Sequence, residues 1–292
     1  MGDITKAVVP IAGLATRFLP LSKALPKELL PVGLKPMVLY ALEELKASGV
    51  QQIIFIVNSN KKQIADYVKP SPQLEKILAD RNQEELLKEM EGLRKTLEGF
   101  SFTFVSVKKP LGDGHAVLQA KKLVGQEPCF VLYPDDIIEA NTPACAQLAQ
   151  VFKTSQKPVT ALARPLKERL SSYGVAVVEK IAQRLYKVKK IVEKPEGEPP
   201  SDLAIIGRRI ITPEVFDYLK KAKPNKKGEV VLSEVLGDMV REGKIVYGYE
   251  IEGKWWEAGN KEDWLKTHLY YSLKDPKLGK ELQRFLKEEK FG

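Results

Sequence analysis

The stretch VVPIAGLATRFLPLSKALPKELLP, residues 8–31, decides the fold of this chain more than any other part of the sequence. It opens as a short apolar strand that ends at Ile11 and then turns through the small-residue segment 12–15. A tight turn after a strand lets backbone N–H groups approach an anion. Arg17, Lys23 and Lys27 follow, and prolines stiffen the loop between them. These cations outline a polyphosphate site, with a merely solvated basic loop as the alternative.

Two aspartates follow the apolar run 129–133 after a single proline, and the run is typical of a buried strand. In open α/β sheets, ligands bind at the carboxyl ends of the strands, where Asp135 and Asp136 are expected to lie. Because neighbouring residues of an extended chain point to opposite sides, only one of them should face a ligand. A turn or helix-capping aspartate is the alternative interpretation.

Composition restricts the class of protein. The chain has 292 residues with 43% hydrophobic and 29% charged residues, which is ordinary for a globular protein. Its net charge of +9 is spread among interleaved acidic and basic residues, so we expect no nucleic-acid partner. We also expect no membrane partner, because no apolar run approaches the ~20 residues of a span. Cys129 and Cys145 are too few for a disulfide framework, which favours a cytoplasmic location.

Short apolar runs alternate with helical patterns, which favours an α/β domain with a mostly parallel sheet wrapped by helices. The pattern predicts strands over residues 7–11, 53–57, 102–107, 129–133, 159–163, 175–178, 185–191, 204–206 and 245–250. It predicts helices over residues 37–48, 115–123, 142–153, 213–220, 231–241 and 261–272. We expect one domain over residues 1–275 and a helical tail over residues 276–292.

Residues 72–98 form a charged helical insertion within this domain. Its apolar residues recur at helical spacing and make one stripe: Leu86, Met90, Leu93 and Leu97. Such a stripe must pack on something, so we expect it to contact either the parent domain or a second subunit.

The segment 12–31 resembles the AGLGTRFLP and TKxxPKExLP motifs of the sugar-1-phosphate nucleotidylyltransferases, in particular of bacterial-type UTP–glucose-1-phosphate uridylyltransferases. Ala15 replaces a glycine of the motif, and Ser22 replaces a threonine. The resemblance extends in order over residues 5–275, through the segments GDGHAV (112–117), LYPDD (132–136), YGV (173–175), VEKP (192–195), DLAIIGR (202–208), GEVVL (228–232) and WEAGNK (256–261). It implies a single Rossmann-like nucleotidyltransferase domain with a mixed, mostly parallel central sheet flanked by helices and a small additional β region.

The same resemblance implies roles for individual residues. The catalytic set would be Arg17, Lys27, Asp135 and Lys194. Nucleotide binding would fall to Ala12, Gly13, Leu14, Ala15, Arg17, Glu28, Lys109 and Gly114. Sugar binding would fall to Gly174, Glu193 and Lys194. Mg²⁺ would be the cofactor, with Asp135 and Glu257 as its candidate ligands. His115 is expected to pack or to form a hydrogen bond, because the implied reaction needs no proton shuttle.

Two of these residues depart from the family pattern. Lys109 stands nearest the position of a glutamine that reads the uracil edge, and an ammonium only donates where an amide both donates and accepts. Glu257 replaces an aspartate, which lengthens the arm by one methylene, ~1.5 Å. It could bind the metal directly, act through water or orient a neighbour.

The expected reaction is Mg²⁺-dependent in-line transfer of a uridylyl group from UTP to glucose 1-phosphate, which yields UDP-glucose and pyrophosphate. Lys109 leaves dTTP or another sugar 1-phosphate as alternatives. A non-catalytic nucleotide-sugar-binding relative is a further alternative, favoured only by Glu257. We expect a homodimer or homotetramer.

Overall fold

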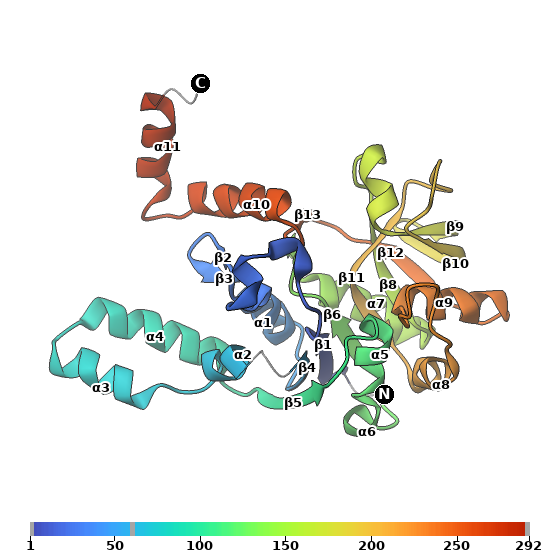
Figure 1. Ribbon diagram of the computed structural model, residues 1–292, viewed down its shortest axis with the longest axis horizontal. Coiled ribbons are helices and arrows are strands. Elements are labelled where there is room, and N and C mark those ends of the chain that lie inside the picture. The colour runs from blue at the N-terminus through green and yellow to red at the C-terminus, as the bar shows by residue number, and fades with distance from the viewer. Residues whose placement is uncertain (1–2, 59–61, 290–292) are drawn as a thin grey trace.

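A computed structural model describes residues 3–58 and 62–289 of the chain. At its centre lies a mixed sheet (Figure 1). Its first half consists of parallel neighbours, in the order β5 (Ser101–Val107), β4 (Gln52–Asn58), β1 (Lys6–Pro10) and β6 (Cys129–Leu132). The sheet continues through β11 (Ala204–Ile211), β8 (Val159–Ala163), β12 (Tyr247–Glu250), β10 (Leu185–Glu193) and β9 (Gly174–Ala182).

The pairings of this second half are antiparallel except between β8 and β12. The mixed sheet is as predicted, but parallel pairing is confined mainly to the first half. The short link between β9 and β10 can only form a hairpin, and a hairpin is antiparallel.

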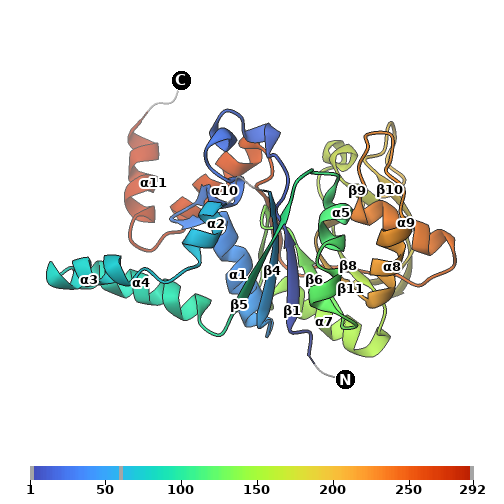
Figure 2. The same cartoon turned by 60° about the horizontal axis from the view of Figure 1, so that its bottom comes forward.

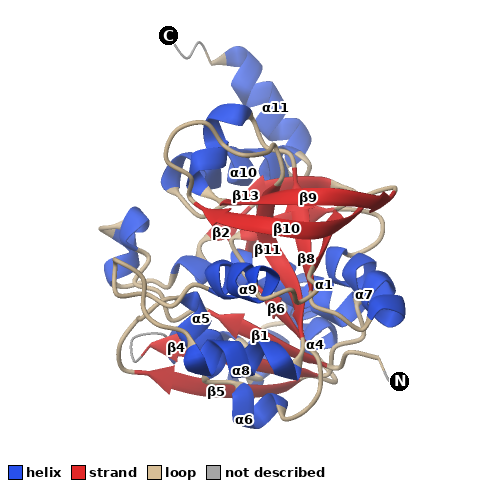
Figure 3. Ribbon diagram, turned by 90° about the vertical axis from the view of Figure 1, so that its right-hand side faces the viewer, coloured by secondary structure: helices blue, strands red, loops and turns tan. Residues whose placement is uncertain are grey.

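Helices cover both faces of the sheet, which is therefore the middle layer of the domain (Figures 2 and 3). On one face, α1 (Met37–Ala47) and α7 (Ala144–Ser155) pack in a core with Ala7 and Val9. On the other face, α5 (Asp113–Leu118), α8 (Pro213–Lys221) and α9 (Leu232–Arg241) pack in a core with Val8. The alternation along β1 explains why residues 7–9 read as a continuous apolar run: both sides of a central strand are buried.

The predicted strands and helices agree with the structure to within a few residues at most ends. One predicted helix, residues 115–123, is divided into α5 and α6 (Lys121–Val124), because the N–H groups of Gln119 and Ala120 bond to carbonyls three residues back. The sequence patterns missed α2 (Lys62–Tyr67) and four short strands: β2 (Pro31–Val32), β3 (Lys35–Pro36), β7 (Asp136–Glu139) and β13 (Lys254–Glu257). The β7–β13 pair and the β2–β3 pair form the small additional β region.

The insertion forms a helical hairpin, α3 (Pro72–Asp80) and α4 (Glu84–Leu97), that projects from the body of the domain (Figures 1 and 2). Its apolar stripe packs on the parent domain only at one end, where Leu97 joins the core below α1. Leu86 at the other end is 44% exposed. Contact with a second subunit therefore stays a prediction.

The chain ends in α10 (Lys261–Leu273) and α11 (Gly279–Glu288). α11 lies within the tail predicted over residues 276–292, of which residues 290–292 lie outside the described part. No helix among the described residues has the length and apolar character that a membrane span requires.

A buried ion pair joins α1 to the sheet. Arg208 on β11 is only 1% exposed, and its Nε and Nη2 donate to the Glu44 carboxylate at 2.8–3.0 Å. Its Nη1 and Nη2 also donate to the carbonyl oxygens of Tyr133, Gly207 and Asp136. The guanidinium is therefore fully paired, and it holds the turn that follows β6.

We predict that Glu44→Ala lowers the free energy of unfolding by about 3–5 kcal/mol, because it leaves the Arg208 charge buried without its counter-charge. Glu43→Ala is the matched control, since Glu43 pairs with Lys35 on the surface and such pairs contribute about 1 kcal/mol or less. Urea unfolding followed by circular dichroism measures both. Equal losses would show that the Glu44–Arg208 pair carries no special weight.

Candidate active site

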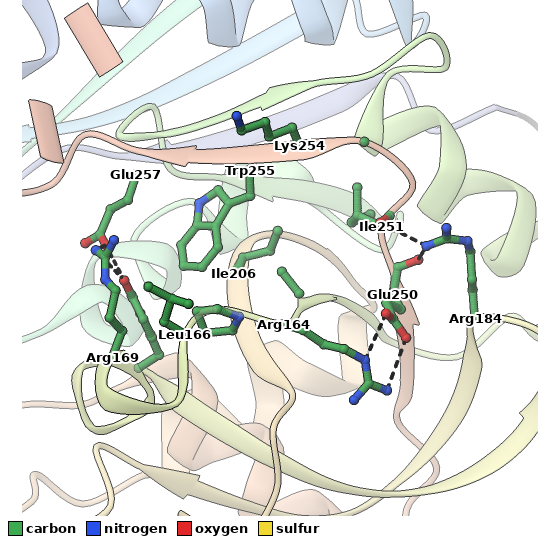
Figure 4. A pocket seen from close by; sticks show the side chains of 14 residues that line it. Arg164, Leu166, Arg169, Arg184, Ile206, Glu250, Ile251, Lys254, Trp255 and Glu257 are labelled. Atoms are coloured by element: carbon green, nitrogen blue, oxygen red, sulfur yellow. Dashed lines mark hydrogen bonds and ion pairs between the residues drawn. The ribbon is translucent and has the colours of Figure 1, made fainter. Parts of the chain in front are cut away.

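A cavity of about 590 Å³ opens at the carboxyl ends of β1 and β6. Its walls bring together most of the residues that the sequence singled out, from segments far apart along the chain. These are Ala12, Gly13, Leu14, Arg17, Lys27, Glu28, Lys109, Asp135, Gly174, Glu193, Lys194 and Glu257. A second cavity of about 400 Å³ adjoins it and shares Tyr173, Ile206 and Glu257 (Figure 4).

The N-terminal loop, residues 12–31, forms one rim of the larger cavity. Ala15 lies outside the lining and has a left-handed backbone with φ of 50°. Glycine adopts this conformation without a steric penalty, which explains the glycine of the motif at this place. The loop is fastened by α10, whose Lys261 Nζ donates to Leu19 O at 2.6 Å and whose Trp264 Nε1 donates to Pro31 O at 2.8 Å.

Lys27 and Asp135 meet at the centre of the cavity. The Lys27 Nζ donates to Asp135 Oδ2 at 2.5 Å, and both side chains are about one-fifth exposed. Burial alone would lower the pKa of the Lys27 ammonium, but the carboxylates of Asp135 and Glu28 outweigh it and raise that pKa. Lys27 is therefore a fixed positive charge beside an acceptor-only carboxylate.

Asp136 lines the same cavity as Asp135 but is held by other partners. Its Oδ2 accepts from Gly207 N at 2.7 Å, and its Oδ1 accepts from Trp255 Nε1 at 2.6 Å. Burial, together with the nearby Asp135 charge, raises its pKa. These two bonds fasten β11 and β13 to the turn after β6, so Asp136 serves the framework of the site.

Glu257 reaches the cavity from the end of β13, which pairs antiparallel with β7 so that Glu257 lies opposite Asp136. Its Oε2 accepts hydrogen bonds from Arg169 Nη2 and from the Tyr173 hydroxyl (Figure 4). Burial raises the pKa of Glu257, although the hydrogen bond from Tyr173 and the charge of Arg169 oppose that shift. Like Asp135, this carboxylate is matched by a cation.

The space between Asp135 and Glu257 suits a divalent cation. A Cβ added at Gly259 would lie 3.0 Å from Asp135 Oδ2 and 3.5 Å from Glu257 Oε1, so both oxygens face one small gap beside a glycine. Among the described residues, no group of three or more His, Cys, Asp or Glu side chains forms a metal cage. The pair could supply one or two ligands, which is what Mg²⁺ takes from protein when phosphates and water complete its shell.

A second acidic group lies at the opposite wall, where β9 and β10 pair Gly174 with Glu193. A Cβ at Gly174 would lie 2.8 Å from Glu193 Oε2, so a larger residue there would displace this carboxylate. The same oxygen accepts from Ser233 Oγ at 2.5 Å. Lys194 Nζ lies 3.8 Å from Glu193 Oε1 and is half exposed. This wall offers the Glu193 carboxylate for hydroxyl groups and the half-exposed Lys194 ammonium for an anion.

Gly114, predicted as a nucleotide contact, lies outside the lining of the cavity. Its N–H donates to Val230 O at 2.9 Å, and it is buried where a Cβ would meet Val230, Leu219 and Leu232 at 2.9–3.0 Å. It is therefore a packing glycine between α5 and the segment before α9. Its neighbours Gly112 and Asp113 line the cavity instead. His115 bonds to Gln119 through its ring, consistent with the expected non-catalytic role.

Sequence reasoning missed four polar residues of the site: Arg169, Tyr133, Ser233 and Arg209. Arg169 acts through a partner that is remote in sequence, since Arg169 and Glu257 are 88 positions apart. Position was the available signal for the others, because Tyr133 lies within the recognised segment 132–136, and Ser233 and Arg209 lie beside the segments 228–232 and 202–208.

Comparison with known proteins places the chain among nucleotidyl transferases. The sequence profile of the family described as Nucleotidyl transferase matches residues 6–273. UTP–glucose-1-phosphate uridylyltransferase of Staphylococcus haemolyticus is 37% identical over 289 residues, which cover 99% of each chain. A second such enzyme, from Staphylococcus saprophyticus, is 37% identical over 285 residues and covers 97% of this chain and 98% of its own.

Solved structures give the same result. The UTP-bound UGPase from Acinetobacter baumannii has a TM-score of 0.88 at 32% identity, covering 98% of this chain and 100% of its own. A crystal structure of UDP-glucose pyrophosphorylase complexed with UDP-glucose has a TM-score of 0.84 at 32% identity, covering 93% of this chain and 100% of its own.

We predict that Gly259→Ala weakens binding of Mn²⁺, used as a probe for the cation, by tenfold or more, because the added methyl group occupies the gap between Asp135 and Glu257. Gly92→Ala is the control: it lies on α4 with nothing within 4 Å of the added Cβ. Electron paramagnetic resonance of free Mn²⁺ measures the affinity. Unchanged affinity in Gly259→Ala would place the cation elsewhere.

Proposed function

The chain belongs to the nucleotidyl transferase family and, within it, to the UTP–glucose-1-phosphate uridylyltransferases, and from this premise we propose that it transfers the uridylyl group of UTP to glucose 1-phosphate. The products are UDP-glucose and pyrophosphate. One observation carries the proposal beyond similarity. A single cavity joins the N-terminal loop and the Lys27–Asp135 pair to the facing Glu193–Lys194 wall, so it offers a triphosphate side and a sugar side.

The reaction is an in-line displacement at phosphorus. An oxygen of the sugar phosphate attacks the α-phosphorus of UTP, a new P–O bond forms, and the bond to the β-phosphate oxygen breaks as pyrophosphate leaves. Both reactants are anions, so the protein must mainly align them and offset their charge. The site needs cations at both ends and no general base.

The positions of the basic residues support a division of work. Arg17 on the exposed loop would hold the leaving β- and γ-phosphates, while the backbone of residues 12–14 would receive the nucleotide. Lys27, fixed beside Asp135, would stand at the point of transfer. Lys194 on the facing wall would hold the incoming sugar phosphate. Glu193 would accept hydrogen bonds from sugar hydroxyls, with Gly174 keeping the backbone close.

The family generally uses a divalent metal, and we propose that Mg²⁺ is the cation here. Asp135 would hold it, with Glu257 beside it. When bound, Mg²⁺ offsets charge on the phosphates during the transfer. The protein residues prepare this place by keeping two carboxylates close and by matching each with a cation, Lys27 or Arg169.

We further propose that the enzyme works in the cytoplasm as a homodimer or homotetramer. Both cysteines are buried and unpaired, which suits a reducing compartment. The projecting α3–α4 hairpin leaves Leu86 and neighbouring apolar side chains exposed, which is unusual unless another surface covers them.

A pyrophosphate-release screen tests the proposed function. UTP, dTTP, CTP, ATP and GTP are each offered with several hexose 1-phosphates and Mg²⁺. We expect the highest rate with UTP and glucose 1-phosphate, because two relatives that are 37% identical over nearly the whole chain are UTP–glucose-1-phosphate uridylyltransferases. A flat response to every pair would overturn the proposal and favour a protein that only binds nucleotide sugars.

The two aspartates should respond differently to removal of their charge. Asp135→Asn should lower kcat by about 100-fold or more, because it removes the charge that faces the transfer site. Asp136→Asn should lower kcat by less than about tenfold and mainly reduce thermal stability, since one amide oxygen cannot accept from both Gly207 N and Trp255 Nε1. Steady-state kinetics and melting curves measure these effects. Equal kinetic losses at both positions would contradict the assignment.

Base choice is predicted from Lys109, which lines the cavity. Its ammonium can donate to O4 of uracil or thymine, whereas the amino groups of cytosine and adenine would repel it. We therefore expect UTP and dTTP to be used within about tenfold of each other, ~1.4 kcal/mol, with CTP and ATP far poorer. Lys109→Gln should sharpen the preference for UTP. An unchanged nucleotide profile in Lys109→Gln would show that Lys109 does not read the base.

A further inference from the structure

Two adjacent arginines of β11 are buried on opposite faces of the sheet, and they differ completely in their partners. Arg208 makes an ion pair with Glu44 and donates to three carbonyl oxygens. Arg209 is 7% exposed, yet its Nε and Nη1 are buried with no hydrogen-bond partner. No hydrogen bond or ion pair is found between the Arg209 side chain and the described residues. The guanidinium lies over the Tyr133 ring in a cation–π contact, with its carbon 5.1 Å from the ring centroid.

Among the described residues, acidic groups that line the cavity with Arg209 form hydrogen bonds to other partners. Asp113 is the acidic group beside Tyr133, but its oxygens already accept from the Tyr133 hydroxyl, from Gly114 N and from Leu232 N. Thr160, which lies opposite Arg209 on β8, also has a buried hydroxyl without a partner. Arg209 is therefore a buried cation without a hydrogen-bond partner, opposite a buried hydroxyl that also lacks one.

Burial of an unpaired charge costs several kcal/mol in ordinary folding, and proteins avoid it unless a ligand completes the site. Arg209 has an evident place for such a ligand, because it lines the large cavity together with Tyr133 and Asp113. A guanidinium presents several donors in one plane and pairs with two oxygens of a carboxylate or a phosphate.

Arg209 belongs to the sugar side of the cavity. Ser233 Oγ donates to Glu193, and N–H of the adjacent Leu232 donates to Asp113. Asp113 also accepts from the Tyr133 hydroxyl. The Tyr133 ring in turn lies over Arg209. The wall that starts at the proposed sugar-binding carboxylate therefore ends at the unpaired guanidinium. The phosphates have their own cations in Arg17, Lys27 and Lys194.

We propose that this enzyme also accepts hexose 1-phosphates that carry a carboxylate on the sugar, the hexuronic acid 1-phosphates, and that Arg209 is the counter-charge for this carboxylate. The inference rests on the proposed function and adds a second class of acceptor to it. The chemistry is unchanged: the phosphate oxygen of the uronic acid 1-phosphate bonds to the α-phosphorus of UTP, and pyrophosphate leaves with the electron pair of the broken bond. The sugar carboxylate takes no part in bond making.

The test compares glucose 1-phosphate with glucuronic acid 1-phosphate as acceptors of UTP, in the unmodified protein, Arg209→Met and Arg209→Lys. We expect the unmodified protein to use both. Arg209→Met should lower kcat/KM for glucuronic acid 1-phosphate by about 10–100-fold, the loss typical of one charged hydrogen-bonded pair. It should change kcat/KM for glucose 1-phosphate by less than about threefold. Arg209→Lys should recover part of the loss.

Arg184→Met is the matched control. Arg184 lines only the smaller, adjoining cavity, where it donates to the carbonyl oxygens of Glu250 and Ile251. Its substitution should leave the ratio of the two acceptors unchanged. Melting temperatures of the substrate-free proteins separate a ligand role from a structural one. Removing an unpaired charge should leave the melting temperature of Arg209→Met equal or higher, and a clear fall would overturn the inference.

Three further outcomes would also overturn it: use of glucose 1-phosphate without measurable use of glucuronic acid 1-phosphate, equal losses with both acceptors in Arg209→Met, or no change in that variant. Calorimetric titration with UDP-glucuronic acid and UDP-glucose decides the case without turnover. If no acceptor is used, the proposed function fails. The inference about Arg209 then stands only if Arg209→Met weakens the binding of UDP-glucuronic acid by tenfold or more and leaves the binding of UDP-glucose unchanged.

Discussion

The site depends on the hydrogen bonds that Arg208 donates to the turn after β6. One buried guanidinium holds Glu44 of α1 and the carbonyl oxygens at both ends of the Tyr133–Asp136 turn. Because the backbone there is fixed, Asp136 can bond to β11 and β13, and Asp135 is left to face the cavity. The position of the principal carboxylate is thus set by a charge that never touches a ligand.

Two carboxylates of the site are each paired with a cation. Asp135 has Lys27 and Glu257 has Arg169, each within ion-pair distance. The charge of Arg169 opposes the rise that burial causes in the pKa of Glu257. The two pairs also leave cations at hand for phosphates. Arg209 differs from these cations because its buried Nε and Nη1 have no hydrogen-bond partner. This difference indicates that a ligand of the cavity carries a negative charge at that place.

The sequence allowed prediction of those parts of the fold that depend on local pattern. The buried strands, the N-terminal loop and the Lys27, Asp135 and Glu193 positions lie in continuous motifs, and the structure brings them to one cavity. The strands β7 and β13 could not be predicted, because four residues carry too little periodicity. The packing of Gly114 could not be predicted either, because Val230, its neighbour in space, is more than a hundred positions away. The same remoteness hid Arg169 from sequence reasoning.

We propose that Asp135 and Glu257 together form the place where a divalent cation meets the nucleotide. Anomalous diffraction from crystals of this protein grown with UTP and Mn²⁺ tests it most directly. The account predicts one strong peak in the gap beside Gly259, within ~2.5 Å of an Asp135 oxygen and next to the triphosphate. A peak bound by Asp136, or one remote from both Asp135 and Glu257, would contradict it.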